Sequence, residues 1–183
     1  MIITFCGHKN IVDRCSVQEK LTNSIILLFS SAQNEHTSLS FYCGGYGEFD
    51  DLSEKTVEET RNRFPNVICE KLFITPYITP TYKERNEFMR QKFDNIVYPP
   101  LETVPYRYAI IRRNEWMIDQ ADIVIAHVRY SWGGAARSLE YAKRRKKERN
   151  PDDINAINGL SKGEARLLLF KSLYMFYFSR PTK

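Results

Sequence analysis

The run CGGYGEFD at residues 43–50 is the stretch that decides the fold of this chain, and it follows the β-like run SLSFY at residues 38–42. A second glycine cluster, SWGGAARSLE at residues 131–140, follows the β-like run IVIA at residues 123–126. Glycine in such a turn lets backbone N–H groups approach a ligand, and the helix that follows points its positive end at the same place. Two such turns on neighbouring parallel strands predict a crevice suited to a phosphate or another anionic group.

Strands and helices alternate along the chain up to about residue 148. Strands are predicted at residues 2–5, 39–43, 67–75 and 122–127, and helices at residues 17–31, 48–64, 106–120 and 132–148. This alternation is typical of a parallel sheet with helices on both faces. The sequence therefore predicts an α/β, Rossmann-like domain over residues 1–149.

Two segments depart from this alternation. Residues 76–105 are rich in proline, tyrosine and charge, and they are too long for a simple connection. We expect them to form a functional arm that contains a short helix near residues 83–92. Residues 150–183 are expected to be a linker followed by a helix over residues 161–178, without the returning strand that a doubly wound domain would have. The apolar face of such a helix must pack on the domain or on a second subunit.

Composition narrows the class of protein. The 183 residues are 43% apolar and include 11 Tyr, 11 Phe and 2 Trp, which is enough for a real core. The net charge of +5 permits contact with nucleotides or nucleic acid but does not require it. Much of the excess lies in KRRKK at residues 143–147, for which a solvated helix end is the simplest interpretation.

The cysteine spacing indicates whether a metal or cofactor is expected, and the N-terminal sequence indicates the cellular compartment. The four cysteines are scattered and form neither a CxxC pair nor a zinc-like Cys/His spacing, so no metal site and no cofactor are expected. Single thiols fit a reducing compartment. The start of the chain enters a strand directly and lacks a basic leader, and no apolar stretch is long enough to span a bilayer. We expect a cytoplasmic protein that does not contact a membrane.

Arg113 and Glu140 form a candidate catalytic pair. Arg113 and Asn114 fall midway along a predicted helix near the crevice, and Glu140 lies one to two turns into the helix that follows the second glycine turn. A buried cation beside a carboxylate can hold a phosphate or a ribose and polarise a glycosidic bond. An ordinary Arg–Glu ion pair on a helix surface is the alternative that spacing alone favours.

Five blocks in order carry a resemblance to a known superfamily. They are FCGH at 5–8, GGYGEFD at 44–50, YPPLE at 98–102, RRNEWM at 112–117 and SWGGA at 131–135. The set resembles the SLOG superfamily, the Rossmann-like group that joins the DNA-processing protein A fold with the LOG phosphoribohydrolases. The match is closest to its small YpsA-related bacterial proteins and covers residues 2 to about 148.

The resemblance implies a nucleotide or nucleotide-derived ligand in the crevice. LOG enzymes hydrolyse nucleoside 5′-monophosphates, and their GGxGTxxE motif aligns with residues 133–140, which implies a catalytic role for Glu140. Their RKxxM motif aligns with residues 113–117 and implies the same for Arg113. In this chain Ala136 and Arg137 replace the third glycine and the threonine of the first motif, and Asn114 replaces the lysine of the second.

These departures favour a binding module that senses a nucleotide, with LOG-like hydrolysis as the alternative. Single-stranded nucleic-acid binding through residues 143–147 is a further alternative. Relatives in the superfamily often dimerise, so the resemblance also implies a homodimer. The residues expected to contact the ligand are Gly7, His8, Gly44, Gly45, Tyr46, Gly47, Asn114, Trp132, Gly133 and Gly134.

The roles of some individual residues stay open. His8 could line the pocket or be a polar turn residue. Tyr46 and Trp132 could stack on a base or only seal the crevice. Cys6 and Cys43 end neighbouring strands, and we interpret them as buried small apolar residues rather than nucleophiles. Asp50 is expected to cap the second helix.

Overall fold

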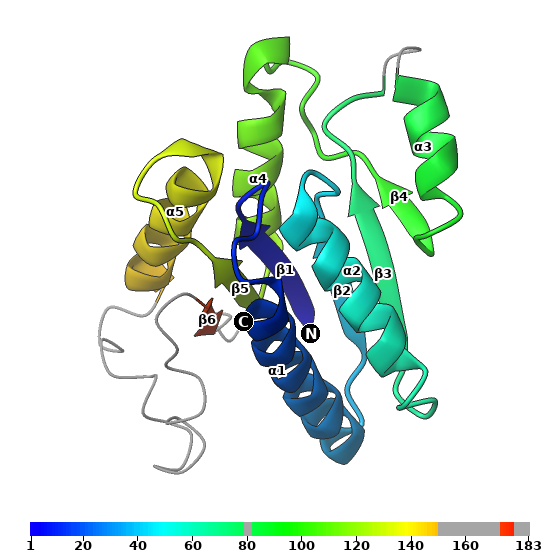
Figure 1. Cartoon of the computed structure of the whole chain (residues 1–183). Coiled ribbons are helices and arrows are strands. Elements are labelled where there is room, and N and C mark those ends of the chain that lie inside the picture. Colours follow the sequence, from blue (N-terminus) through cyan, green and yellow to red (C-terminus); the bar gives the residue numbers. More distant parts are fainter. Residues whose placement is uncertain (79–81, 150–172, 178–183) are drawn as a thin grey trace.

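A six-stranded sheet forms the centre of the protein (Figure 1). The computed structural model describes residues 1–78, 82–149 and 173–177. The strands are β1 (Ile2–Gly7), β2 (Leu39–Cys43), β3 (Cys69–Ile74), β4 (Asn95–Val97), β5 (Ile123–His127) and β6 (Leu173–Tyr177), in the spatial order β4-β3-β2-β1-β5-β6. The first five are parallel and β6 is antiparallel to β5. The predicted Rossmann-like α/β fold is confirmed.

Helices cover both faces of the sheet. They are α1 (Arg14–Glu35), α2 (Glu48–Arg61), α3 (Lys83–Met89), α4 (Ala109–Gln120) and α5 (Gly133–Arg149), with a 3-10 turn at Tyr106–Tyr108. Figure 1 shows α1 and α2 side by side on one face, while α4 and α5 lie on the other and α3 sits beside β4. The connection from each parallel strand through a helix to the next strand explains why the loops at the carboxyl ends of the strands gather at one edge.

Alternating side chains of the strands contribute to hydrophobic clusters on both faces of the sheet. On one face, Ile3 and Phe5 of β1 pack with α1 and α2, and Phe5 stacks on Phe41 with ring centroids 6.0 Å apart. On the other face, Cys6 of β1 and Val124 of β5 pack against α4 and α5. Helices cover β5 on both faces, so all five of its residues are buried. A strand in this position needs mostly apolar side chains on both faces.

The arm between β3 and α4 is partly regular. The predicted short helix is present as α3. The arm also contains β4, a three-residue parallel strand that pairs with β3 and that the sequence did not predict. Three residues are too few for a detectable alternation of apolar and polar side chains.

The C-terminal tail differs from expectation. Residues 173–177 form β6, whose backbone pairs Met175 with Ile125 of β5, so the helix predicted over residues 161–178 is wrong here and a returning strand exists. The rest of that predicted helix lies outside the described residues. Without β6, one side of β5 would present a row of unpaired N–H and C=O groups at a buried edge, and pairing satisfies them.

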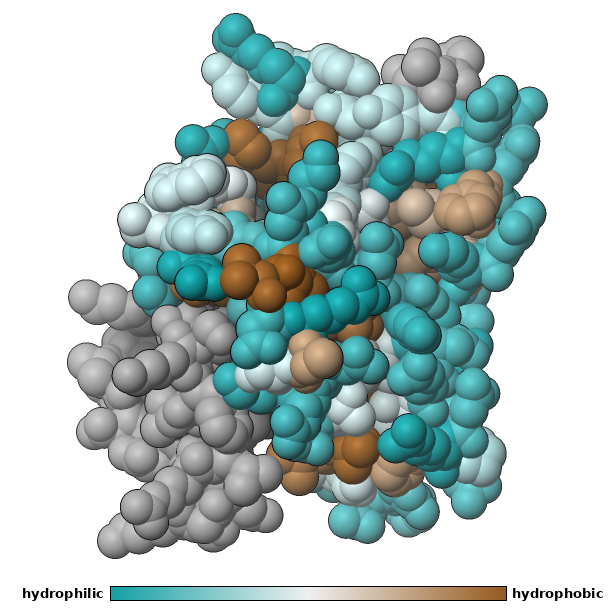
Figure 2. Space-filling model, in the orientation of Figure 1, coloured by the Kyte–Doolittle hydropathy of each residue, from teal (hydrophilic) through white to brown (hydrophobic). Residues whose placement is uncertain are grey.

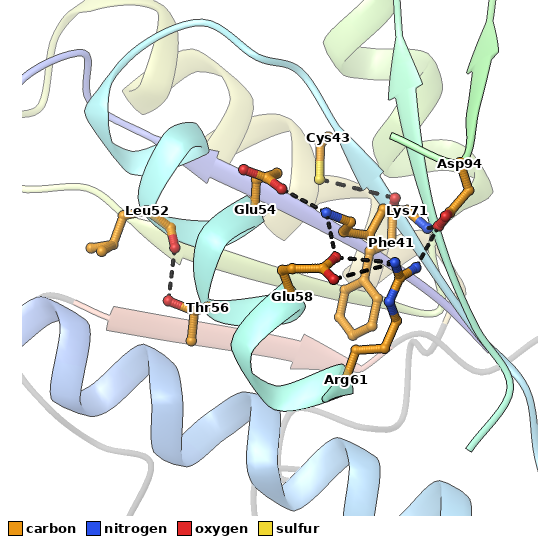
Figure 3. Close-up of polar contacts among 9 residues, drawn as sticks. All are labelled: Phe41, Cys43, Leu52, Glu54, Thr56, Glu58, Arg61, Lys71 and Asp94. Carbon is orange, nitrogen blue, oxygen red and sulfur yellow. Dashed lines mark hydrogen bonds and ion pairs between the residues drawn. The ribbon is translucent and has the colours of Figure 1, made fainter. Parts of the chain in front are cut away.

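A network of ion pairs fastens α2 to β3 (Figure 3). The Nζ atom of Lys71 lies 2.6 Å from a Glu54 oxygen and 2.7 Å from a Glu58 oxygen. Arg61 contacts Glu58 at 3.1 Å and Asp94 at 2.8 Å. Burial alone would lower the pKa of Lys71, but its hydrogen bonds to the two glutamates outweigh burial and raise that pKa. The buried ammonium is therefore fully compensated by the protein itself.

The outer surface of the face shown in Figure 2 is mostly hydrophilic, with hydrophobic residues in small separate patches. Within the described ranges, no helix combines the length and apolar character needed to cross a bilayer.

Candidate functional site

A cavity of about 310 Å³ lies at the carboxyl ends of β1, β2 and β5, between the two glycine turns and α4. Nine of the residues singled out from the sequence line it: Gly7, His8, Gly44, Tyr46, Arg113, Asn114, Trp132, Gly133 and Gly134. Its volume falls at the lower end of the range of small-molecule sites. The loops that follow three neighbouring strands thus bring distant parts of the chain to one place.

Arg113 is the most deeply buried charge of the cavity. Its side chain extends from α4, is 1% exposed, and donates one hydrogen bond, from Nη1 to the carbonyl of Ile74 at 3.0 Å. Its Nε has no hydrogen-bond partner among the described residues. Burial lowers the pKa of Arg113, although Asp50 and Tyr46 act to raise it. A buried guanidinium with unused donors favours an anion or another hydrogen-bond acceptor.

Asp50 is the only carboxylate among the described residues that line the cavity. It lies in the first turn of α2, and its Oδ2 accepts the backbone N–H of Tyr46 at 2.8 Å. The N-cap residue itself is Gly47, so Asp50 supports the start of the helix from inside the first turn rather than from the expected cap position. Burial raises the pKa of Asp50 to about 6, against the opposing effects of the Tyr46 N–H and Arg113, and Asp51 adds to the rise.

Gly44 allows Arg113 and Asp50 to converge. A Cβ at this position would stand 2.6 Å from Arg113 Nη1 and 2.9 Å from Asp50 Oδ2. Real Cβ atoms do not approach that closely, so any side chain here would push the two charged groups apart. The glycine is therefore explained by the close approach of a guanidinium and a carboxylate at the wall of the cavity.

The N-terminus of α5 opens onto the same cavity. Gly133 has φ +91°, a left-handed conformation that favours glycine, and Gly134 follows it in the first turn. A Cβ at either position would meet nothing within 4 Å. No packing contact therefore requires glycine at residue 134, and N–H groups in the first turn of a helix have no partner within the helix, which is where a helix attracts an anion.

Aromatic rings form the rim of the cavity. Tyr130 stacks on Trp132 with ring centroids 5.4 Å apart, and His8 packs against Tyr130 at 5.1 Å. Trp132 is 70% exposed. His8 Nε2 accepts the backbone N–H of Tyr130 at 3.1 Å, and burial lowers the pKa of His8, which favours the neutral imidazole that can accept this hydrogen bond.

Tyr46 is already covered by cations. The guanidinium carbon of Arg85, from α3, lies 4.4 Å from the centroid of the Tyr46 ring, and that of Arg113 lies 5.1 Å from it. Arg85 also donates from Nη2 to the carbonyl of Gly45. These contacts hold the first glycine turn against α3, and they leave Trp132 as the more accessible surface for a planar ring.

Three of the expected site residues do not line the cavity. Gly45 packs over Phe73, and Gly47 packs on the backbone of Lys9, because a Cβ would come within 2.7 Å and 2.6 Å of them respectively. Glu140 is exposed and pairs with Lys143 at 3.0 Å. The carboxylate that faces Arg113 inside the cavity is Asp50 instead.

The structure also bears on the expected roles of the cysteines at the ends of β1 and β2. Cys6 donates from Sγ to the carbonyl of Ala135 at 3.3 Å, and burial raises the pKa of its thiol to about 12, with a further rise from Asp50. Cys43 is buried as well, and burial raises the pKa of its thiol. Thiols in this state are poor nucleophiles. Within residues 1–78, 82–149 and 173–177, no group of three or more His, Cys, Asp or Glu side chains is arranged to hold a metal ion.

The basic run at residues 143–147 belongs to the far end of α5. Its members begin ten residues beyond Gly133, which is roughly 15 Å along a helix. Lys143 contacts Glu140, and Arg145 Nε lies 2.6 Å from Asp119. The run is therefore separate from the cavity.

Sequence reasoning missed two participants, Asp50 and Arg85. Asp50 is the last residue of the glycine block at residues 43–50. Its place in the first turn of the predicted helix could have indicated that its carboxylate lies near the crevice. Arg85 carried no signal, because only the packing of α3 brings it to Gly45 and Tyr46. No protein-family model matches this chain, and no curated protein matches its sequence.

Proposed function

We propose that this protein binds a nucleotide or a nucleotide-derived ligand in the cavity at the carboxyl ends of its parallel strands, as a sensor or binding module. The fold class places ligands at this edge in general, because the loops there are free to vary while the sheet holds them in position. A homodimer is part of the proposal on the strength of the resemblance, and light scattering of the purified chain checks it.

One observation carries the proposal: two independent anion-attracting features face the same cavity. The α5 N-terminus offers open N–H groups at Gly133 and Gly134, and Arg113 offers a buried guanidinium with an unused Nε. Either feature alone would be weak. Together they favour a ligand that carries a phosphate or a similar group.

The aromatic side chains at the rim of the cavity provide a surface for the base of a nucleotide. Trp132 presents an exposed indole next to Gly133, backed by the ring of Tyr130. Stacking of a base on an aromatic side chain contributes about 1–3 kcal/mol. A phosphate inside the cavity with a base at its rim is the arrangement that we expect for a nucleotide.

The two alternatives receive less support. Hydrolysis by the LOG mechanism would use Glu140, the carboxylate of the aligned motif, and Glu140 lies outside the cavity; the cavity carboxylate, Asp50, does not belong to that motif. Nucleic-acid binding through residues 143–147 would use a surface separate from the glycine turns. Release of free base from nucleoside monophosphates would reinstate the first alternative, and a steep loss of affinity with salt would reinstate the second.

The test is a thermal-shift and calorimetry panel of AMP, ADP, ADP-ribose, ribose 5-phosphate and adenosine. At a hundredfold excess over Kd, a bound ligand stabilises the fold by about 2.7 kcal/mol. For a domain of this size we expect an increase in Tm of roughly 5–10 °C for phosphorylated compounds. Absence of any response to the phosphorylated compounds would contradict the proposal.

A matched pair of variants makes the test specific. Arg113→Met removes the buried guanidinium, whereas Arg112→Met removes an exposed one on the same helix that pairs with Glu115. We expect about a hundredfold loss of affinity in the first variant and less than a twofold change in the second. Equal losses would show that the positive charge of the helix, rather than the cavity, attracts the ligand.

A further inference from the structure

The two charged groups beside Gly44 approach each other without closing into an ion pair. Arg113 Nη1 and Asp50 Oδ2 reach to 2.6 and 2.9 Å of one point, the place of a Gly44 Cβ. Among the described residues, Arg113 donates only to the carbonyl of Ile74, and Asp50 accepts only from the N–H of Tyr46. The two atoms are therefore at most about 5.5 Å apart (2.6 plus 2.9 Å), a gap that one oxygen atom beside Gly44 can bridge with hydrogen bonds of about 2.7–3.0 Å.

A structural role alone does not account for a carboxylate at residue 50. An asparagine could accept the Tyr46 N–H equally well without carrying a charge into a partly buried site. The pKa of Asp50, raised by burial to about 6, indicates that its ionised form is held at a cost in stability. Residues kept at such a cost are found at functional sites more often than elsewhere.

The chemistry of the pair selects what can bridge it. A guanidinium only donates hydrogen bonds, and an ionised carboxylate only accepts them. The bridging group must therefore accept from Arg113 and donate to Asp50. A hydroxyl does both, whereas an ionised phosphate oxygen cannot donate and would be repelled by the carboxylate. A hydroxyl also replaces a bridging water without loss of either hydrogen bond.

We propose that Asp50, together with Arg113, recognises a sugar hydroxyl of the ligand, so that the cavity distinguishes ribosyl from deoxyribosyl compounds. This inference rests on the proposed function and divides its two features between the parts of the ligand: the phosphate binds at the α5 N-terminus, and a sugar hydroxyl binds between Arg113 and Asp50. It assigns Asp50 as a specificity-determining residue and makes a ribose phosphate moiety the part of the ligand that the cavity holds.

The experiment compares AMP with its 2′-deoxy and 3′-deoxy analogues by calorimetry at pH 7.5. We expect the wild-type protein to bind AMP at least tenfold more tightly than one of the two analogues, because the missing hydroxyl leaves Arg113 and Asp50 unbridged. In Asp50→Asn the side chain keeps an oxygen for the Tyr46 N–H, but Nδ2 can no longer accept. The preference should fall below threefold in this variant.

Asp51→Asn is the matched control, since Asp51 is an exposed carboxylate on the same turn of α2 and lines no part of the cavity. We expect this variant to keep the wild-type preference. A preference unchanged in Asp50→Asn, or lost equally in both variants, would overturn the inference.

The outcomes also separate this inference from the function on which it rests. Equal binding of AMP and both analogues by the wild-type protein would leave nucleotide binding intact and remove the role of Asp50. Binding of none of the three compounds, nor of ribose 5-phosphate, would remove both.

Discussion

Two buried cations of this protein, Lys71 and Arg113, stand in opposite electrostatic situations. Lys71 is 3% exposed and lies within 2.7 Å of carboxylates from both Glu54 and Glu58 (Figure 3). Arg113 is 1% exposed, and within the part of the chain that the structure describes it has a single hydrogen bond, to a carbonyl, and an Nε without a partner. The hydrogen bonds from Lys71 to its two glutamates outweigh burial and raise the pKa of Lys71. Burial lowers the pKa of Arg113.

The difference separates structure from function. A cation that the protein neutralises by itself stabilises the contact between α2 and β3, and it has nothing left to offer a ligand. A buried cation whose hydrogen-bond donors lack partners costs stability, and a ligand that supplies acceptors offsets that cost. Four variants test this division, in order of decreasing expected effect.

Lys71→Met should give the largest loss of stability. Removal of the ammonium leaves Glu54 and Glu58 as uncompensated neighbours, which costs 3–5 kcal/mol for fully buried pairs and about 2–3 kcal/mol here, where Glu58 is partly exposed. Urea denaturation measures the change. Lys55→Met, which breaks an exposed pair with Glu59, should cost less than about 0.5 kcal/mol. Similar losses in the two variants would show that the network adds little.

Asp50→Asn should stabilise the protein above pH 6. The folded-state pKa of Asp50, about 6, lies above its unfolded value, so the folded state binds more protons between pH 4 and 6 and wild-type stability falls as the pH rises through 6. At pH 7.5 we expect a gain of about 1–2 kcal/mol in the variant.

The pH dependence is the decisive readout for this variant. Urea midpoints between pH 4.5 and 8 should show the gain shrinking below pH 6 and vanishing near pH 4. A difference that does not vary with pH, or a variant less stable than wild type throughout, would contradict the assignment of a strained carboxylate.

Arg113→Met should change stability by about 1 kcal/mol or less, in contrast to Lys71→Met. The carbonyl of Ile74 loses its donor, but a desolvated charge is removed and methionine fills most of the volume. Urea denaturation of both variants under the same conditions gives the comparison. A loss as large as that of Lys71→Met would make Arg113 a structural residue and weaken the proposed site.

Gly134→Ala should leave stability unchanged or slightly raised, by less than about 1 kcal/mol, because a Cβ there meets nothing and alanine favours a helix. The same methyl group stands where an anion would approach the helix N-terminus, so AMP affinity should fall roughly fivefold. Unaltered affinity in a fully folded variant would place the phosphate elsewhere in the cavity.

Several elements of this fold follow from local sequence alone. β2 and β5 are runs whose residue types favour strands, and each is followed by glycines and then by a helix. Such patterns depend on neighbours within a few residues, so the parallel sheet and the position of its glycine turns could be predicted. The same reasoning placed Arg113 and Gly133 at one edge, where both line the cavity.

Other features depended on contacts that no local pattern contains. The aromatic-rich segment that includes β6 suits a helix or a strand by composition, and pairing with the edge of β5 decides its state. The expected partner of Arg113 was Glu140, on the basis of motif spacing, whereas the folded chain brings Asp50 to it across Gly44. Arg85 reaches the site only through the packing of α3.

The sequence by itself therefore determined which segments form the sheet and where the backbone can admit a ligand, because hydrophobic periodicity and glycine act over short distances along the chain. Only the tertiary structure decided which charges meet at the cavity and which cancel within the protein, because the energy of a buried charge depends on groups that are close in space and distant in sequence.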